Sequence, residues 1–109
     1  MSITKTEKST LLVETSGELD HHLATKIRSQ IDAAISKERK NIIFDFSKLT
    51  FMDSSGIGMI MGRYKKIQKF SGKLVIVAPK PQVKRILEIS GLLSIITVES
   101  SVSKALKKM

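Results

Sequence analysis

The sequence of 109 residues contains no cysteine and no tryptophan, and it has only one tyrosine and four phenylalanines. Without cysteine the chain cannot form disulfide bonds, thiolate metal sites or cysteine nucleophiles. So few aromatic side chains also leave little on which nucleic-acid bases could stack. No stretch approaches the roughly 20 apolar residues of a membrane span, and residues 1–10 lack the apolar core of a signal peptide. We therefore expect a cytoplasmic protein that needs no metal or cofactor and binds neither membranes nor, directly, nucleic acid.

The rest of the composition is typical of a globular domain. It is 41% hydrophobic and 27% charged, and the length is close to the commonest size of one domain. We therefore expect residues 1–109 to form a single domain.

Positive charge is in excess, since 19 Lys and Arg against 10 Asp and Glu give a formal net charge of +9. Such an excess suits nucleic acid, an acidic partner protein or an anionic membrane surface. Many of the cations fall in the runs 36–40, 63–69 and 104–109, where predicted helices end and positive charge complements the helix dipole. We therefore interpret them mainly as solvated helix ends and not as a dedicated anion groove.

Apolar residues follow strand and helix patterns in alternation along the chain. Short apolar runs predict strands at 3–5, 10–16, 41–46, 73–78 and 94–98. Apolar spacings of three and four predict helices at 23–35, from the serine turn to residue 70, at 81–90 and at 101–108. This order predicts an α/β domain in which parallel strands are joined by right-handed helical crossovers, and it allows an antiparallel N-terminal edge.

Several polar residues mark the ends of these elements. Asp20 is the expected N-cap of the first helix, Pro81 suits a first helical position, and Gly91 suits a helix C-terminus. In a parallel sheet the loops at 17–22, 50–56 and 78–81 should gather at one edge, where ligands and partners usually bind.

The turn FMDSSGIG at 51–58 carries two adjacent serines between a predicted strand and a predicted helix. If Asp53 caps this helix, Ser54 and Ser55 occupy its first two positions with their hydroxyls facing solvent. A phosphate there would meet free N–H groups and the positive end of the helix dipole, beside the negative charges of Asp53 and Asp20. Serine and aspartate are also common at helix starts that are never modified. The residues alone therefore leave both a phosphorylation switch and a plain cap open.

Other motifs indicate less. The glycines of GIGMIMG, 56–62, are misplaced for a dinucleotide-binding loop, and no P-loop is present. The adjacent His21 and His22 make a poor metal-binding pair without further ligands. A serine hydrolase would place a glycine two residues before Ser54, which this turn lacks, although His21 could approach Ser54 across the edge.

The predicted helix after the turn contains two glycines and two methionines whose positions predict how it packs and what it contacts. Gly58 and Gly62 should let this helix approach its neighbours closely, which would offset up to ~1 kcal/mol of lost helix propensity each. Met59 and Met61 flank the apolar stripe, where each is either core filler or an adaptable contact for a partner.

Three segments carry a resemblance to a known family: GELDHH at 17–22, FDFSKLTFMDSSGIGMIMGRYK at 44–65 and VKRILEISGLLSII at 83–96. In order and spacing they resemble the bacterial anti-sigma factor antagonists, or anti-anti-sigma factors, of the STAS-domain family. The similarity runs from about Leu11 to Leu106. It implies a single STAS domain over 1–109, with a STAS-like α/β fold of a four-to-five-stranded mixed β-sheet flanked by about four α-helices.

The resemblance also implies regulation by partner switching. The unmodified antagonist binds an anti-sigma factor that is also a serine protein kinase, and the anti-sigma factor releases its sigma factor. The kinase uses ATP to phosphorylate the antagonist, here at Ser54, which abolishes the complex, and a phosphoserine phosphatase restores it. The expected partner-binding residues are Asp20, Asp53, Ser54, Ser55, Gly56 and Met59. The chain would then be a regulatory protein and not an enzyme.

Two other classes of function stay open. A small-ligand or nucleotide-sensing STAS module could use the same edge of the sheet, and ligand would then raise its melting temperature. A small basic nucleic-acid-binding domain would show affinity that falls steeply with salt.

Overall fold

The structure is a computed structural model that describes all 109 residues. It contains five strands, four α-helices and one 3₁₀ turn, in the order β1 (Ser2–Thr6), β2 (Thr10–Leu19), α1 (His21–Ala34), β3 (Asn41–Met52), α2 (Ser54–Gln68), β4 (Leu74–Val77), α3 (Pro81–Ile89), η1 (Leu92–Ser94), β5 (Thr97–Glu99) and α4 (Val102–Lys107). None of the helices combines the length and the hydropathy that crossing a bilayer would require.

All five strands form one mixed sheet in the order β1-β2-β3-β4-β5. β1 pairs antiparallel with β2 across a short turn, and every other neighbouring pair is parallel. Parallel neighbours need a crossover between them, and α1, α2 and α3 supply these crossovers in turn. The predicted mixed sheet with an antiparallel N-terminal edge is confirmed.

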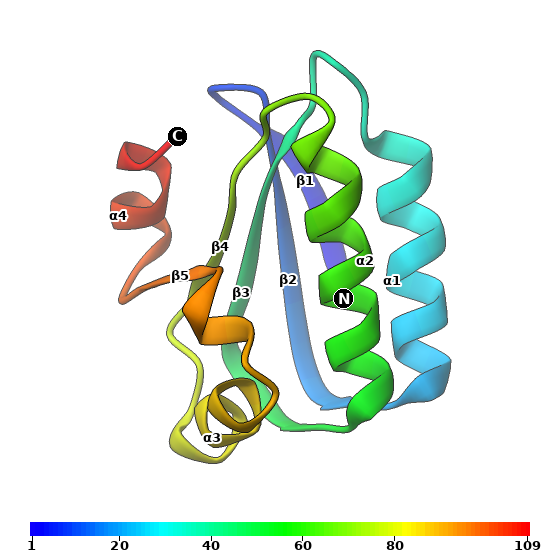
Figure 1. Ribbon diagram of the computed structural model, residues 1–109, viewed down its shortest axis with the longest axis vertical. Coiled ribbons are helices and arrows are strands. Elements are labelled where there is room, and N and C mark those ends of the chain that lie inside the picture. Colours follow the sequence, from blue (N-terminus) through cyan, green and yellow to red (C-terminus); the bar gives the residue numbers. More distant parts are fainter.

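The strand order decides which face of the sheet each helix covers. Because every parallel strand is added on the same side of the previous one, right-handed crossovers place α1, α2 and α3 on one face. Their apolar stripes and that face enclose the main core of 19 buried residues. α4 lies on the opposite side of the sheet from α1 and α2 (Figure 1), over a smaller cluster formed by Ile43, Val75, Val77 and Ala105.

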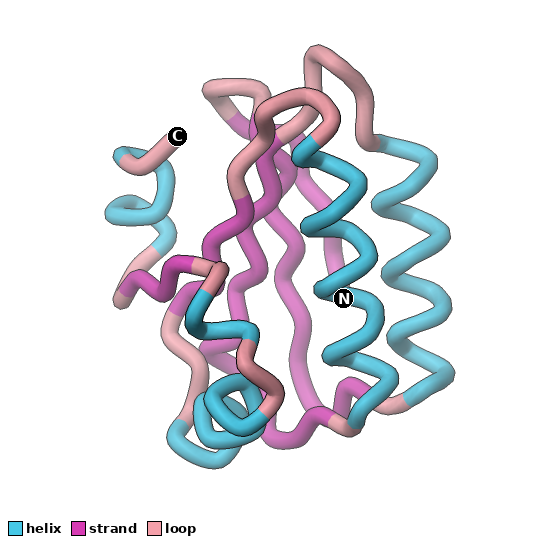
Figure 2. Tube along the Cα trace, viewed as in Figure 1, coloured by secondary structure: helices cyan, strands magenta, loops and turns pink.

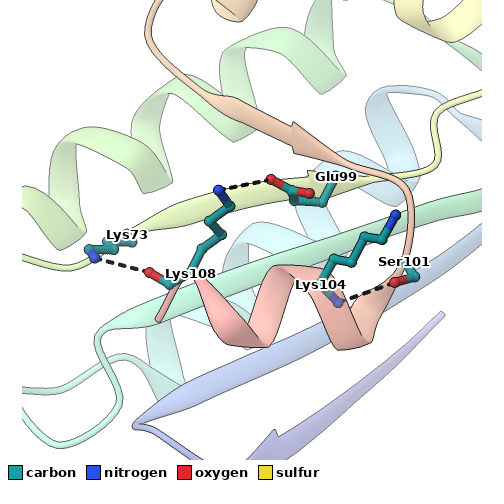
Figure 3. Close-up of polar contacts among 5 residues, drawn as sticks. All are labelled: Lys73, Glu99, Ser101, Lys104 and Lys108. Atoms are coloured by element: carbon teal, nitrogen blue, oxygen red, sulfur yellow. Dashed lines mark hydrogen bonds and ion pairs between the residues drawn. The ribbon is translucent and has the colours of Figure 1, made fainter.

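Polar contacts hold α4 in place beside β4 and β5 (Figure 3). Ser101 caps the helix by accepting a hydrogen bond from Lys104 N at 3.1 Å. Lys73 Nζ donates to Lys108 O at 3.0 Å, and Lys108 Nζ forms an ion pair with Glu99 Oε2 at 3.7 Å. These contacts supplement a small apolar interface, because Ala105 is the only fully buried residue of α4.

The central strands β2 and β3 are longer than the sequence predicted. β2 continues past residue 16 to Leu19, and β3 continues past residue 46 to Met52. Exposed polar residues break the apolar run in both extensions, and register shifts at Glu14/Ser16 and Gly17/Glu18 disturb the two-residue period. The segments 17–19 and 50–52, expected in loops, are therefore strand.

The C-terminal elements differ from prediction in a similar way. Residues 92–94 form η1, and the last strand covers only Thr97–Glu99 instead of 94–98. Gly91, with φ of +84°, ends the α3 segment as predicted, and its carbonyl accepts a hydrogen bond from Ser94 N that closes η1. α2 stops at Gln68, two residues earlier than expected, whereas Pro81 begins α3 as predicted.

The same substitution, Ile→Ala, tests this architecture when it is made once at a buried position and once at an exposed position. Ile76 of β4 is fully buried in the main core, whereas Ile89 at the end of α3 is 75% exposed. We expect Ile76→Ala to lower the free energy of unfolding by about 2–5 kcal/mol because it leaves a cavity. Ile89→Ala, the matched control, should change it by about 0.5 kcal/mol or less. Urea denaturation measures both, and equal losses would contradict the assignment of the core.

Candidate functional site

The N-termini of α1 and α2 lie side by side because β2 and β3 end together. The register of these parallel strands pairs Leu19 with Met52, so each strand is followed at once by an aspartate that caps the next helix. Asp20 Oδ1 accepts a hydrogen bond from Leu23 N at 2.9 Å. Asp53 Oδ1 accepts from Ser55 N at 2.9 Å and from Gly56 N at 3.4 Å. Both predicted caps are confirmed.

Three further hydrogen bonds tie the neighbouring segments to this place. Asp53 N donates to Leu19 O at 3.3 Å, and Thr50 Oγ1 donates to Gly17 O at 3.0 Å. Gln82 Nε2, at the start of α3, donates to Thr50 O at 3.3 Å. The predicted convergence of the three loops at one edge of the sheet is therefore confirmed, and we call this edge the switch edge, comprising residues 17–22, 50–56 and 78–82.

The two serines of the turn have different surroundings. Ser54, the first residue of α2, is exposed, and the capping hydrogen bonds of the turn leave its hydroxyl free. Ser55 is half-buried, and its Oγ lies 3.4 Å from His21 Nδ1. The expectation that both hydroxyls face solvent is confirmed for Ser54 and holds only in part for Ser55, because the helical rotation of about 100° per residue turns Ser55 toward α1. His21, which the sequence analysis expected could approach Ser54, lies beside Ser55 instead.

Gly56 and Met59 lie below the surface, although both were expected to contact a partner. A Cβ on Gly56 would lie 2.5 Å from Met52 Cγ and 3.1 Å from Leu19 Cδ2, so glycine lets the first turn of α2 pack on the sheet. Met59 is only 5% exposed and belongs to the main core. The Met59 side chain is therefore core filler that also lines the groove between α1 and α2, and contact of Gly56 and Met59 with a partner stays a prediction.

One apolar side chain of the switch edge was missed by the sequence analysis. Phe51, two residues before Asp53, is 47% exposed. It follows the buried Leu49 by two residues, and the strand pattern alone would have placed it on the buried face. An exposed aromatic ring three residues before the solvent-facing Ser54 is suited to bind a protein surface.

A groove runs along the seam between α1 and α2 and opens beside the serine turn. It measures about 460 Å³ and is lined by His21, Ala24, Thr25, Arg28, Ser55, Gly58, Met59, Gly62 and Arg63. The spacing of three and four places the lining residues of each helix on one stripe. Figure 2 shows the two helices side by side along their whole length.

The two glycines of this groove correct a prediction. Gly58 and Gly62 were expected to let α2 pack closely against a neighbour. A Cβ at either position would meet no atom within 4 Å, so no neighbour approaches. The glycines widen an open groove instead.

Arg63 corrects a second prediction, since it was counted among the solvated cations of the run 63–69. It is only 8% exposed because the spacing Ile60, Arg63, Ile67 places it on the buried stripe of α2. Its Nε lies 3.0 Å from Asp32 Oδ1, an ion pair too poorly aligned for a hydrogen bond, and its Nη1 has no partner. Burial lowers the pKa of the Arg63 guanidinium; the Asp32 carboxylate opposes this shift and the charge of Arg28 adds to it.

The chemistry available at the switch edge is limited. No group of three or more His, Asp or Glu side chains lies close enough to hold a metal ion. His21 and Ser55 form one pair of base and hydroxyl, but no acidic side chain hydrogen-bonds to His21 as a triad would require. The site therefore offers two helix N-termini, a free hydroxyl, an exposed aromatic ring and a basic groove, which together suit recognition.

Comparison with known proteins identifies the family. The sequence model of the STAS domain matches residues 2–105. The chain therefore belongs to the STAS domain family.

Within that family the chain is similar to anti-sigma factor antagonists. It is 39% identical over 103 residues to the anti-sigma F factor antagonist of Paenibacillus polymyxa, which covers 94% of this chain and 88% of that protein. It matches the structure of the anti-sigma factor antagonist SpoIIAA in its unphosphorylated form with a TM-score of 0.88 and 30% identity, over 98% of this chain and 93% of that one. It matches the phosphorylated form of the Bacillus cell fate determinant SpoIIAA with a TM-score of 0.79 and 30% identity, over 98% and 96%.

Replacement of Asp53 tests how the turn is held. Asp53→Ala removes the acceptor for two backbone amides and should lower the free energy of unfolding by about 1 kcal/mol. Asp53→Asn keeps a hydrogen-bond acceptor, so its free energy of unfolding should lie within about a few tenths of a kcal/mol of the wild-type value. Urea denaturation compares the variants with the wild type. If Asp53→Asn lost as much stability as Asp53→Ala, the charge of Asp53 rather than its capping hydrogen bonds would hold the turn.

Proposed function

We propose that the protein is an anti-sigma factor antagonist regulated by phosphorylation of Ser54. In its unmodified form it binds, through the switch edge, an anti-sigma factor that is also a serine protein kinase, and so frees a sigma factor. Phosphorylation of Ser54 by that kinase ends the interaction, and a phosphoserine phosphatase restores it. The protein acts in the cytoplasm as a regulatory binding protein and not as an enzyme.

The observation that carries this proposal is the free hydroxyl of Ser54. Asp53 makes both capping hydrogen bonds of α2, so Ser54 has no structural task that its modification would disturb. Ser54 is exposed, whereas Ser55 is half-buried against His21. A kinase would therefore reach the first serine more easily than the second. The similarity to SpoIIAA, which has been solved in unphosphorylated and phosphorylated forms, supports regulation by phosphorylation.

The position of Ser54 also explains how a phosphate could change binding without unfolding the protein. A phosphoserine adds about 1.5 to 2 negative charges at neutral pH. At the first position of α2 these charges lie at the positive end of the helix dipole, so the helix tolerates them although Asp53 already accepts from the Ser55 and Gly56 amides. The nearby carboxylates of Asp53 and Asp20 repel them, and the switch edge becomes strongly negative. A partner that fits the neutral hydroxyl would meet a bulky dianion instead.

Phosphosite mapping tests the proposed residue. Native complexes isolated with the protein as bait should yield the anti-sigma kinase. Incubation of the purified kinase with ATP and the wild-type protein should place phosphate on Ser54, as located by mass spectrometry. Ser54→Ala should remain unmodified, and Ser55→Ala, the matched control, should be modified as the wild type is. Phosphate on Ser55 alone, or none, would contradict the assignment.

Binding measurements test the electrostatic mechanism. Ser54→Ala should bind the kinase with ADP about as tightly as the wild type, because the hydroxyl is not needed for the fold. Ser54→Asp should bind about tenfold or more weakly, because it buries an unpaired charge in the interface. Isothermal titration calorimetry measures both affinities. Equal affinities of the two variants would show that charge at residue 54 does not govern the complex.

A further inference from the structure

Two glycines lie in the middle of α2 without a packing reason. Glycine destabilises a helix interior relative to alanine, because it loses more backbone freedom on folding. Such a loss is commonly offset by close packing, but a Cβ at Gly58 or Gly62 would meet nothing within 4 Å. The space beside them is the groove between α1 and α2. The missing side chains leave this groove open to a molecule that is not part of this chain.

Charge around the same groove points to an anion. Arg28 and Arg63 both line it, and Arg28 is close enough to perturb Arg63 unfavourably. The one nearby carboxylate, Asp32, is shared, at 3.0 Å from Arg63 Nε and 3.2 Å from Lys66 Nζ. Arg28 forms no ion pair, and the buried Nη1 of Arg63 has no partner. The exposed guanidinium of Arg28 is therefore free to pair with an anion in the groove.

The groove is continuous with the switch edge. His21 and Ser55 belong to both, and Ser54 is the neighbour of Ser55 in the chain. A protein bound over Ser54 would therefore reach the groove without a long extension. The excess of positive charge in the groove is complementary to an acidic side chain of such a protein.

We propose that the groove between α1 and α2 receives an acidic side chain of the protein that docks over Ser54. The partner's backbone lies over Gly58 and Gly62, and its carboxylate lies between Arg28 and Arg63. This inference rests on the proposed function for the identity of the docking protein. It adds a second contact region, along α2, to the one at the serine turn.

Alanine substitutions separate a structural role of the glycines from a binding role. Gly58→Ala and Gly62→Ala add a methyl group in open space, so each should raise the melting temperature by about 4 °C. Each should also weaken binding of the anti-sigma kinase by about tenfold or more, because the methyl group meets the partner's backbone. A lower melting temperature would show that the glycines serve the fold. Unchanged affinity, with wild-type binding intact, would overturn the inference and leave the proposed function standing.

Arg28 tests the charge. Arg28→Gln should weaken kinase binding by about tenfold, since a charge-assisted hydrogen bond is lost. Lys104→Gln, on α4 across the sheet, makes the same change in net charge and should bind as the wild type does. Equal weakening by both substitutions would mean that net charge, and not the groove, attracts the partner. Arg28 suits this test because it is exposed, whereas loss of Arg63 would disturb Asp32.

A test without the partner distinguishes failure of the inference from failure of the proposed function. Succinate is added to the ¹⁵N-labelled wild-type protein at constant ionic strength, with chloride as the control anion. We expect saturable NMR shifts of the Gly58 and Gly62 amides and of Arg63 Nε–H, which Arg28→Gln abolishes. If no kinase binds the wild type but these shifts occur, the proposed function fails and the anion site stands. Absent shifts, or the same shifts with chloride, would overturn the site.

Discussion

Backbone hydrogen bonds between β2 and β3 determine where the candidate functional residues of this protein meet. The two parallel strands run in register to Leu19 and Met52, so both chains leave the sheet at the same level. An aspartate follows each strand directly and caps the next helix. The positive ends of two helix dipoles therefore lie side by side, with two carboxylates and a free serine hydroxyl between them and solvent. A shift of this register by one residue would separate them.

The turn before α2 divides its tasks among consecutive residues. Asp53 satisfies the first backbone amides, Gly56 gives the helix room to pack against Met52, and Ser55 faces α1. Ser54 is left with no structural duty. The proposed reversible modification of Ser54 suits such a position, because the folded state has to tolerate both forms. The doubled serine is explained in this way: the two hydroxyls face different surroundings and only one is free.

Several residues along the seam between α1 and α2 lower the stability of the fold. Gly58 and Gly62 weaken α2 without any packing in return, and Arg63 is buried with an unpaired nitrogen. Proteins commonly carry such costs in stability where they bind another molecule, because the groups that a partner will contact are left without full packing or pairing in the free protein. The seam begins at Ser55, so these costs lie next to the residue whose modification would control binding.

The sequence by itself determined the order of strands and helices, the parallel crossovers, the caps at Asp20 and Asp53 and the special position of the serine turn. These features depend on local periodicity and on which side chains can reach nearby backbone amides, and both can be read from neighbouring residues. Only the tertiary structure decided that β2 and β3 extend to Leu19 and Met52, that Ser55 faces His21, that Arg63 is buried and that Gly58 and Gly62 line an open groove. Each of these depends on the distance between elements far apart in the chain, and the spacing of residues along one helix or strand does not contain that distance.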